Sequence, residues 1–256
     1  MIELRQLRKR FDHADHDAVG PLDLRVPPGE LLALVGTSGS GKSTTLHMIN
    51  RLVEPSAGSV LIDGIDISGQ DPVALRRGIG FVFQAIGLFA HMSVADNIAI
   101  TPRLLRWPRD EVAARVDGLL ELVHLDPAIY RARMPHQLSG GQRQRAAFAR
   151  ALAARPRIML MDEPFGALDP LTRDELSAEF RTIHEKLGLT SIIVTHDMTE
   201  AFLLADRIAV MRAGRLVQIG TARALLADPA DEFVRQMVRM PRLRAARLAR
   251  AMGEPG

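Results

Sequence analysis

Three unbroken apolar runs stand out along the chain, in the segments GELLALVG (residues 29–36), PRIMLMDEP (156–164) and TSIIVTHD (190–197). Unbroken runs are typical of strands buried on both faces, whereas strands with one wet face alternate apolar and polar positions. Each run is followed by a segment in which apolar residues recur with helical spacing, at residues 42–52, 172–188 and 198–205. This order of strand and helix predicts an α/β fold built around a parallel sheet with right-handed crossovers.

Two regions depart from this alternation of strand and helix. The segment GSVLIDGIDI at residues 58–67 alternates in polarity, which predicts antiparallel strands beside the main sheet. From about residue 93 onwards the pattern is almost entirely helical, so we expect a helical subdomain at about residues 90–154, inserted between the first and second buried strands. Further along, RIAVMRAGRLVQIG at residues 207–220 predicts two short strands around a turn at Gly214.

Composition excludes some classes of protein. The 256 residues suffice for a large core, and the absence of cysteine excludes disulfides and thiolate metal sites. We find neither a secretory leader nor a run of about eighteen apolar residues, so we expect no membrane-spanning helix. The net charge of +3 is too small to indicate nucleic acid, and we expect no nucleic-acid partner. Residues 239–256 form a basic tail, which we interpret as a solvated helix rather than a surface for a membrane or an acidic partner.

A glycine-rich loop joins the first buried strand to the first helix. Its sequence GTSGSGKST fits the pattern G-x-x-x-x-G-K-[ST], in which backbone N–H groups surround phosphate oxygens at the positive end of a helix. In such a loop Lys42 reaches the β- and γ-phosphates, and the hydroxyl of Ser43 ligates Mg²⁺. We expect nucleotide contacts from the whole loop, which consists of Gly36, Thr37, Ser38, Gly39, Ser40, Gly41, Lys42, Ser43 and Thr44.

Two acidic residues close the second buried strand. Asp162 and Glu163 follow the run IMLM, at the carboxyl end of a parallel strand, where ligands bind in sheets of this kind. We expect Asp162 to hold Mg²⁺, directly or through water, and Glu163 to activate the water that attacks the γ-phosphate. The alternative is that one of the two acids only caps the following turn.

Two further polar residues follow apolar strands. His196 follows the third buried strand, which should run beside the phosphate-binding strand and so bring the imidazole near the γ-phosphate. Gln84 follows the short strand in FVFQAIGLF, and its amide is suited to bind Mg²⁺ or the attacking water. With Lys42 and Glu163, these two residues complete the expected catalytic set, and Gln84 joins Ser43 and Asp162 as an expected metal ligand.

A second candidate anion site lies in HQLSGGQRQRAAFARAL, at residues 136–152. Ser139, Gly140 and Gly141 precede an Ala- and Arg-rich helix, which we expect to begin near Gln142. The glycines let backbone amides approach an anion, the serine adds a hydroxyl, and the helix adds its dipole. The alternative is an ordinary helix N-cap.

These motifs occur in an order that resembles the nucleotide-binding domain of ABC transporters, and the sequence LSGGQ at residues 138–142 is the most specific of them. The likeness covers residues 1–238, taken as one ABC-type P-loop NTPase domain with a parallel core, an antiparallel β subdomain and the inserted helical subdomain. The resemblance implies ATP and Mg²⁺ as cofactors. It also implies a head-to-tail homodimer, in which Ser139, Gly140, Gly141 and Gln142 of one subunit close on the γ-phosphate held by the other.

The same resemblance assigns two more residues and several partners. It implies that Asp169, in GALD, couples the two sites at the dimer seam, and that Phe11 stacks on adenine. It implies a separate membrane permease that contacts residues 85–100, an indirect link to a substrate-binding protein, and a peripheral location on the cytoplasmic face of the inner membrane.

The amino-acid sequences of several segments narrow the resemblance to one branch of this family. MINRLVEPSAG, LLRWP and MDEPFGALDPLTRDEL are similar to importers of quaternary amines such as glycine betaine, choline and carnitine. Some members of that branch carry a C-terminal pair of regulatory domains, which we do not expect here. An importer of an amino acid, a sulfonate or a polyamine is the main alternative. A soluble ABC ATPase without a transport role, or a P-loop kinase, would leave parts of the motif set without a role.

Overall fold

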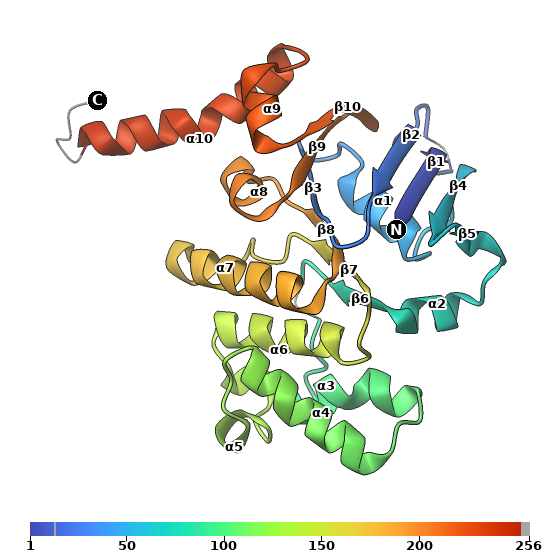
Figure 1. The fold of residues 1–256 in the computed structure, drawn as a ribbon, viewed down its shortest axis with the longest axis vertical. Helices are drawn as coiled ribbons and strands as arrows, with labels where there is room; N and C mark the ends of the chain where they lie inside the picture. Colours follow the sequence, from blue (N-terminus) through green and yellow to red (C-terminus); the bar gives the residue numbers. More distant parts are fainter. Residues whose placement is uncertain (13, 86, 252–256) are drawn as a thin grey trace.

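The computed structural model describes residues 1–12, 14–85 and 87–251, and its centre is a six-stranded sheet (Figure 1). The strand order is β10-β9-β3-β8-β7-β6. All neighbours are parallel except β10 and β9, which form an antiparallel hairpin. The strands are β3 (Leu31–Gly36), β6 (Ile79–Val82), β7 (Ile158–Asp162), β8 (Thr190–Val194), β9 (Arg207–Arg212) and β10 (Arg215–Gly220). The predicted α/β fold with a parallel core is therefore confirmed.

The central strands are buried on both faces because alternate residues enter two different cores. On β3, Leu31, Ala33 and Val35 belong to one hydrophobic cluster, while Leu32 and Leu34 belong to the other. This two-sided burial is the reason that the strands are unbroken apolar runs in the sequence. One core includes α7 (Pro170–Leu187) and α8 (Met198–Leu204), and the other includes α1 (Lys42–Ile49).

A second, antiparallel sheet packs against the α1 side of the molecule (Figure 1). Its order is β2-β1-β4-β5, with β1 (Ile2–Lys9), β2 (Val19–Val26), β4 (Ala57–Ile62) and β5 (Ile65–Asp66). The predicted antiparallel strands at residues 58–67 are β4 and β5. The N–H of Gly20, in β2, donates to the carbonyl of Gly214 in the β9–β10 turn at 2.8 Å. This bond ties the two sheets together beside the phosphate-binding loop.

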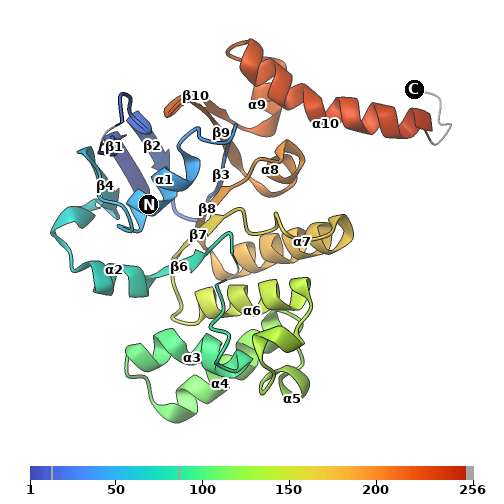
Figure 2. The same ribbon diagram turned by 180° about the vertical axis from the view of Figure 1, so that it is seen from behind.

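The inserted helices form one end of the molecule (Figure 2). They are α3 (Val94–Leu104), α4 (Arg109–Leu122), α5 (Pro127–Tyr130), the 3₁₀ turn η2 (Pro135–Gln137) and α6 (Gly140–Leu152). A helical insertion was predicted between the first and second buried strands. In the structure the edge strand β6 also lies in that interval, and the helices follow it.

The remaining elements are peripheral. They are the 3₁₀ turn η1 (Ile67–Gly69) and the helices α2 (Pro72–Gly78), α9 (Ala222–Ala227) and α10 (Glu232–Ala251). Helix α10 extends away from the body of the molecule and runs through residue 238 without a break (Figure 1). The division into a domain at residues 1–238 and a basic tail at 239–256 therefore stays a prediction, and residues 252–256 lie outside the described part.

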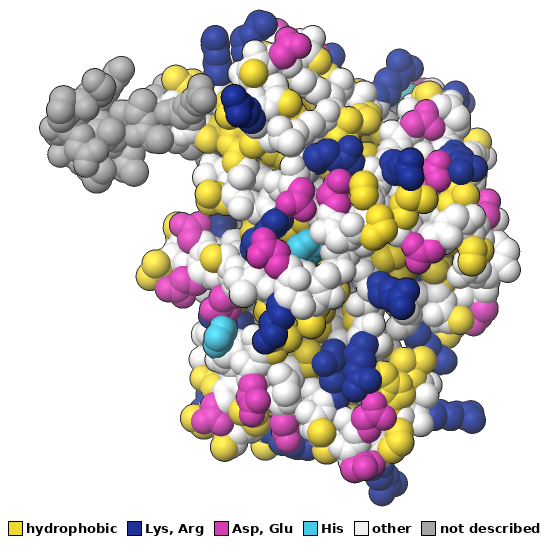
Figure 3. Space-filling model, viewed as in Figure 1, with side chains coloured by type: hydrophobic (Ala, Val, Ile, Leu, Met, Phe, Trp, Pro, Cys, Tyr) yellow, Lys and Arg dark blue, Asp and Glu magenta, His cyan; other side chains and the backbone are white. Residues whose placement is uncertain are grey.

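In the part of the chain that the structure describes, no helix combines the length and the apolar character needed to cross a bilayer. On the face shown in Figure 3, Lys and Arg side chains are interspersed with Asp and Glu.

Candidate functional site

The glycine-rich loop spans the gap between β3 and α1, as the sequence predicts. Gly41 is the N-cap of α1 and has a φ of 94°, which a residue with a side chain rarely adopts. A Cβ at this position would lie 2.5 Å from the carbonyl oxygen of Ala18. The tight loop therefore requires glycine at Gly41 for its conformation and for its close contact with the segment before β2.

Lys42 is enclosed by the loop that it closes. Its side chain is buried, and Nζ donates to the carbonyls of Gly36 and Thr37, at 2.9 Å each. Burial lowers the pKa of Lys42, and the carboxylates of Glu163 and Asp162 partly oppose this effect. A desolvated ammonium held by two neutral carbonyls and by the hydroxyl of Ser40 is well placed to bind an anionic oxygen brought to the loop.

A candidate metal site lies where the first turn of α1 meets the end of β7. The hydroxyl of Ser43 donates to Oδ1 of Asp162 at 2.8 Å. Burial raises the pKa of Asp162, and the bond from Ser43 partly opposes this. A hydroxyl and a carboxylate are the oxygen ligands that Mg²⁺ accepts, with phosphate and water completing its shell, so these two residues fit the ion. Clusters of three or more His, Asp or Glu side chains suited to a metal are absent from the described residues.

Glu163 lies at the centre of a group of three polar side chains. Its Oε2 accepts from Nε2 of Gln84 at 3.2 Å and lies 3.3 Å from Nδ1 of His196. Glu163 itself has a φ of 44°, an unusual backbone conformation for a residue with a side chain. The structure thus brings together three of the predicted catalytic residues. Within the described residues, no bond joins Gln84 to Ser43 or Asp162, so its role as a metal ligand stays a prediction.

Strand pairing explains this convergence. Strand β8 pairs in parallel with β3 on one side and with β7 on the other. The backbone N–H of Glu163 also donates to the carbonyl of Val194, at the end of β8, at 2.9 Å. The carboxyl ends of the three strands therefore bring the phosphate loop, the two acids and His196 to one edge. The predicted neighbourhood of the His196 strand and the phosphate-binding strand is confirmed.

The second candidate anion site lies at the N-terminus of α6. Oγ of Ser139 accepts from the N–H of Gln142 at 3.3 Å, and Oε1 of Gln142 accepts from the N–H of Ser139 at 3.0 Å, which is a capping box. Nε2 of Gln142 donates to the hydroxyl of Tyr130 at 3.0 Å. The helix begins at Gly140, so the predicted start near Gln142 is two residues late. The reason is that Ser139 provides the cap and both glycines accept helical geometry.

Gly141 has a packing role that its place in an anion site does not suggest. A Cβ at Gly141 would lie 2.7 Å from Cγ2 of Thr172, on the first turn of α7. The close approach of α6 to α7 therefore depends on a residue without a side chain at this position.

The two anion sites do not meet within one chain. No hydrogen bond between described residues joins the segment 139–142 to the loop at residues 36–44. In Figures 1 and 2, α6 lies among the inserted helices, and α1 lies beside the antiparallel sheet on the other side of β7 and β8. In a single protomer, one candidate site therefore lies between β3 and α1, and the other lies at the N-terminus of α6.

Two predicted nucleotide-site residues lie at exposed positions. Asp169 is the N-cap of α7, where its Oδ1 accepts from the N–H of Thr172 at 3.1 Å, and this bond lowers its pKa. Phe11 follows β1 and is 45% exposed, with Nζ of Lys9 5.1 Å from its ring centre. Neither arrangement tests the contact predicted for the residue, and both contacts stay predictions.

The structure also shows a neighbour of the metal site that the sequence analysis missed. Nε2 of His47 lies 3.8 Å from Oδ2 of Asp162. The signal was present, because His47 is four residues after Ser43 and so lies on the same face of α1.

Comparisons with known proteins agree with this geometry. The family model described as ABC transporter matches residues 19–166. The glycine betaine/carnitine/choline transport ATP-binding protein OpuCA of Bacillus subtilis is 50% identical over 243 residues, which are 95% of this chain and 63% of that protein. The glycine betaine uptake system ATP-binding protein YehX of Escherichia coli is 49% identical over 236 residues, 92% of this chain and 76% of that protein.

Other similar proteins differ in the cargo that their names give. The sulfate/thiosulfate import ATP-binding protein CysA of Mycobacterium bovis is 47% identical over 233 residues, 91% of this chain and 65% of that protein.

Among solved structures, a dimeric ATP-binding cassette in a post-hydrolysis state, bound to ADP and Pi, has a TM-score of 0.77 and 33% identity, covering 86% of this chain and 98% of that chain. By the matched family model and by these relatives, the chain belongs to the ABC transporter family.

Proposed function

We propose that this chain is the ATP-hydrolysing subunit of an ABC importer for a quaternary-amine osmoprotectant, and that it acts as a homodimer. The proposal rests on the separation, in one protomer, of two segments suited to bind an anion. One has a buried lysine beside two carboxylates, and the other is a capped helix N-terminus.

The glycine-rich loop binds the triphosphate of ATP. Its backbone N–H groups surround the phosphate oxygens, and Lys42 exchanges the carbonyls of Gly36 and Thr37 for the β- and γ-phosphates. Ser43 and Asp162 hold Mg²⁺, with Gln84 as a third ligand when it turns from Glu163. The bound metal supplies neutralisation of charge on the phosphates. Phe11 stacks on the adenine ring.

Glu163 activates the attacking water. Its carboxylate accepts a proton while the water oxygen bonds to the γ-phosphorus and the bond from that phosphorus to the bridging oxygen breaks. His196 holds the carboxylate in place through Oε2. Gln84 holds the same oxygen until it turns to the metal. A base positioned in this way contributes about 10²–10⁴ to the rate.

The Ser139 site of a second copy completes the coordination of the γ-phosphate. Ser139, Gly140 and Gly141 offer a hydroxyl and backbone amides at the positive end of α6, and Gln142 maintains the cap. Asp169 lies at the seam between the copies. Support comes from the dimeric cassette bound to ADP and Pi, which shares this fold. Binding of ATP closes the dimer, and hydrolysis weakens it.

The cargo is assigned from the relatives and not from the site. OpuCA and YehX are named for glycine betaine and related compounds, at 50% and 49% identity, and CysA, at 47%, makes sulfate the second candidate. The chain works at the cytoplasmic face of the inner membrane, on a permease supplied with cargo by a substrate-binding protein. The permease contacts the segment 85–100, and nucleic acid has no part in the cycle.

The dimer is tested with Glu163→Gln. This variant binds ATP but lacks the base, so with MgATP it is expected to elute at the mass of a dimer in gel filtration with light scattering, and to elute as a monomer without nucleotide. Glu175→Gln, on the exposed surface of α7, is the matched control and should turn over ATP like the unmodified chain. A Glu163→Gln variant that stays monomeric with saturating MgATP would contradict the proposed dimer.

The cargo is tested separately with the whole transporter. The permease and binding protein that co-purify with this chain are reconstituted in vesicles, and ATP-dependent uptake of glycine betaine, choline and sulfate is compared. Uptake of sulfate alone would replace the osmoprotectant assignment and leave the ATPase assignment intact.

A further inference from the structure

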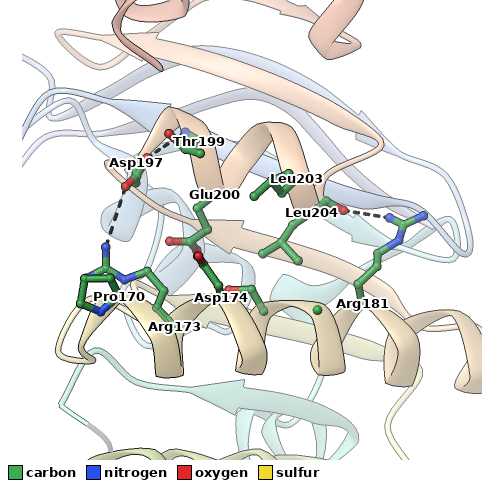
Figure 4. A pocket seen from close by; sticks show the side chains of 11 residues that line it. Pro170, Arg173, Asp174, Arg181, Asp197, Thr199, Glu200, Leu203 and Leu204 are labelled. Atoms are coloured by element: carbon green, nitrogen blue, oxygen red, sulfur yellow. Dashed lines mark hydrogen bonds and ion pairs between the residues drawn. The ribbon is translucent and has the colours of Figure 1, made fainter. Parts of the chain in front are cut away.

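A cavity outside the nucleotide-binding loops lies between α7 and α8 (Figure 4). Its volume is about 460 Å³, which is in the range of small-molecule sites. At about 30 Å³ for each water, a space of this size corresponds to about fifteen water molecules, so a single bridging water does not fill it.

Two buried polar side chains in this cavity have unused hydrogen-bonding capacity. Glu200, on α8, is 8% exposed, and Ser177, on α7, is 7% exposed. Within the described part of the chain, Oε1 of Glu200 and Oγ of Ser177 have no hydrogen-bond partner. Figure 4 shows Glu200 reaching from α8 toward α7. Both atoms are covered by protein, so a ligand reaches them only after the two side chains change rotamer. Since unpaired buried polar atoms cost free energy, a ligand that bonds to both is favoured here.

The arginines that line the cavity are already neutralised. Nε of Arg181 lies 2.7 Å from Glu185, and its Nη2 lies 2.9 Å from Asp206. Nη1 of Arg173 lies 3.9 Å from Oδ2 of Asp197. Neither cation therefore offers an unpaired charge to an anionic ligand.

Two acidic side chains of the cavity, unlike its arginines, have no ion-pair partner among the described residues. Among the described residues, neither Asp174 nor Glu200 forms an ion pair, and both line the cavity. Burial raises the pKa of Glu200 to about 7, and the bond from Thr195 and the charge of Arg173 oppose this only in part. The cavity also has an apolar wall formed by Ala178, Leu203 and Leu204.

We propose that the α7–α8 cavity binds a small primary organic ammonium ion. The N–H groups of the ammonium donate to Oε1 of Glu200 and Oγ of Ser177, and its charge is balanced by Glu200 and Asp174. The carbon chain of the ligand lies against Leu203 and Leu204. A quaternary ammonium has the charge but no N–H group, so it leaves both buried oxygens unpaired and binds more weakly.

The cavity adjoins the segment that holds His196. Oγ1 of Thr195 donates to Oε2 of Glu200 at 3.1 Å and accepts from the N–H of Asp197 at 3.0 Å. The backbone amides of residues 195–200 are therefore suitable reporters of an occupied cavity.

The test is an NMR titration of the full chain with n-butylammonium chloride, at constant chloride concentration and physiological ionic strength. Saturable shifts of the amides of Ser177 and residues 195–200 are expected, with a Kd on the order of millimolar for so small a ligand. The chain-matched n-butyltrimethylammonium should bind at least about tenfold more weakly, because it lacks N–H donors. Equal affinity for the two cations, or shifts that never saturate, would overturn the proposal.

Variants locate the site. Glu200→Gln removes the buried charge, and Asp174→Asn removes the second acidic group. Each variant should raise the Kd for n-butylammonium at least about tenfold. Glu175→Gln changes an exposed acid of the same helix that does not line the cavity, and should leave the Kd unchanged. Circular dichroism checks that each variant is folded. Equal loss of affinity in Glu175→Gln and Glu200→Gln would show that binding is a surface charge effect and would refute the site.

Discussion

At the scale of single residues, burial sets the properties of the charged groups near the nucleotide site. It lowers the pKa of Lys42 and raises the pKa of Asp162. Both changes mean that the folded chain holds these charges at a cost, which an added phosphate or metal ion of opposite sign relieves. The two groups are therefore prepared for binding by the fold itself.

Replacing Lys42 tests the phosphate site. Lys42→Ala is expected to weaken ATP binding about 10- to 100-fold, because a charge-assisted bond to phosphate contributes about 1.5–3 kcal/mol. Isothermal titration calorimetry with MgATP measures this change. Lys186→Ala, an exposed lysine on α7, is the control and should bind ATP normally. An unchanged affinity in Lys42→Ala would show that the loop has been assigned the wrong ligand.

Glu200 predicts a pH dependence of stability. Burial raises the pKa of Glu200 from 4.5 to about 7, so ionising this carboxyl group costs folding free energy. The stabilising contribution of Glu200 is complete below about pH 4.5 and is lost as the pH rises to about 7. Each step of one in pKa corresponds to about 1.4 kcal/mol, which gives up to about 3 kcal/mol in all. Glu200→Gln mimics the protonated form, so its stability relative to the unmodified chain should rise by up to this amount between about pH 5 and pH 8.

Urea unfolding of both proteins at the two pH values measures this difference. Glu175→Gln is again the control, since an exposed carboxylate should give almost no such change. If the difference between Glu200→Gln and the unmodified chain is the same at both pH values, folding does not raise the pKa of Glu200.

At the scale of elements, the contact between α6 and α7 positions the second anion site. The capping box fixes the first turn of α6, and Gly141 lets that turn approach Thr172 of α7. The N-terminus of α6 is thus held by its own cap and by the neighbouring helix. A rigid N-terminus with oriented amides is suited to bind an anion without further rearrangement.

Two glycine-to-alanine changes separate packing from helix propensity. Gly141→Ala places a Cβ 2.7 Å from Cγ2 of Thr172 and should destabilise the chain by about 1–3 kcal/mol. Gly118→Ala, in the interior of α4, meets no atom within 4 Å and should stabilise it by up to about 1 kcal/mol. Urea unfolding midpoints measure both. Stabilisation by Gly141→Ala would mean that α6 and α7 are not in tight contact.

At the scale of the whole molecule, the six-stranded sheet positions the phosphate loop at residues 36–44, and the helical insertion contains the second candidate anion site at residues 139–142. Lys42, Glu163 and His196 lie at one edge of the sheet because β3, β7 and β8 are neighbours. Ser139 belongs to α6, which packs on a different side of these strands (Figure 2). Under the proposed function, a triphosphate contacts both sites only when two chains associate, and association then depends on ATP.

Mixing two inactive variants tests this arrangement. Lys42→Ala disables the loop, and Ser139→Asp keeps a good N-cap but places a negative charge opposite the phosphate. A mixed dimer contains one fully intact composite site, so an equimolar mixture should recover about a quarter of the unmodified ATPase rate if dimers form at random and sites act independently. Each variant alone is the control. A mixture as inactive as its components would argue against composite sites.

Local patterns in the sequence determined much of this protein. The runs at residues 31–36, 158–162 and 190–194 predict buried strands because short unbroken apolar runs are typical of strands covered on both faces. The phosphate loop can also be predicted from the sequence, because local backbone geometry requires its glycines at residues such as Gly41. The capping box of Ser139 and Gln142 is a local signal too, although the helix was predicted to begin two residues late.

Only the tertiary structure decided which side chains meet across elements. Gln84 contacts Glu163 across a separation of 79 residues, and His47 approaches Asp162 because α1 packs against β7. The role of Gly141 against α7 and the cavity between α7 and α8 have the same origin. A local pattern fixes the backbone conformation and the buried face of one element. The order of strands and the packing of helices, which set the distances between elements, arise from the burial of all apolar faces together.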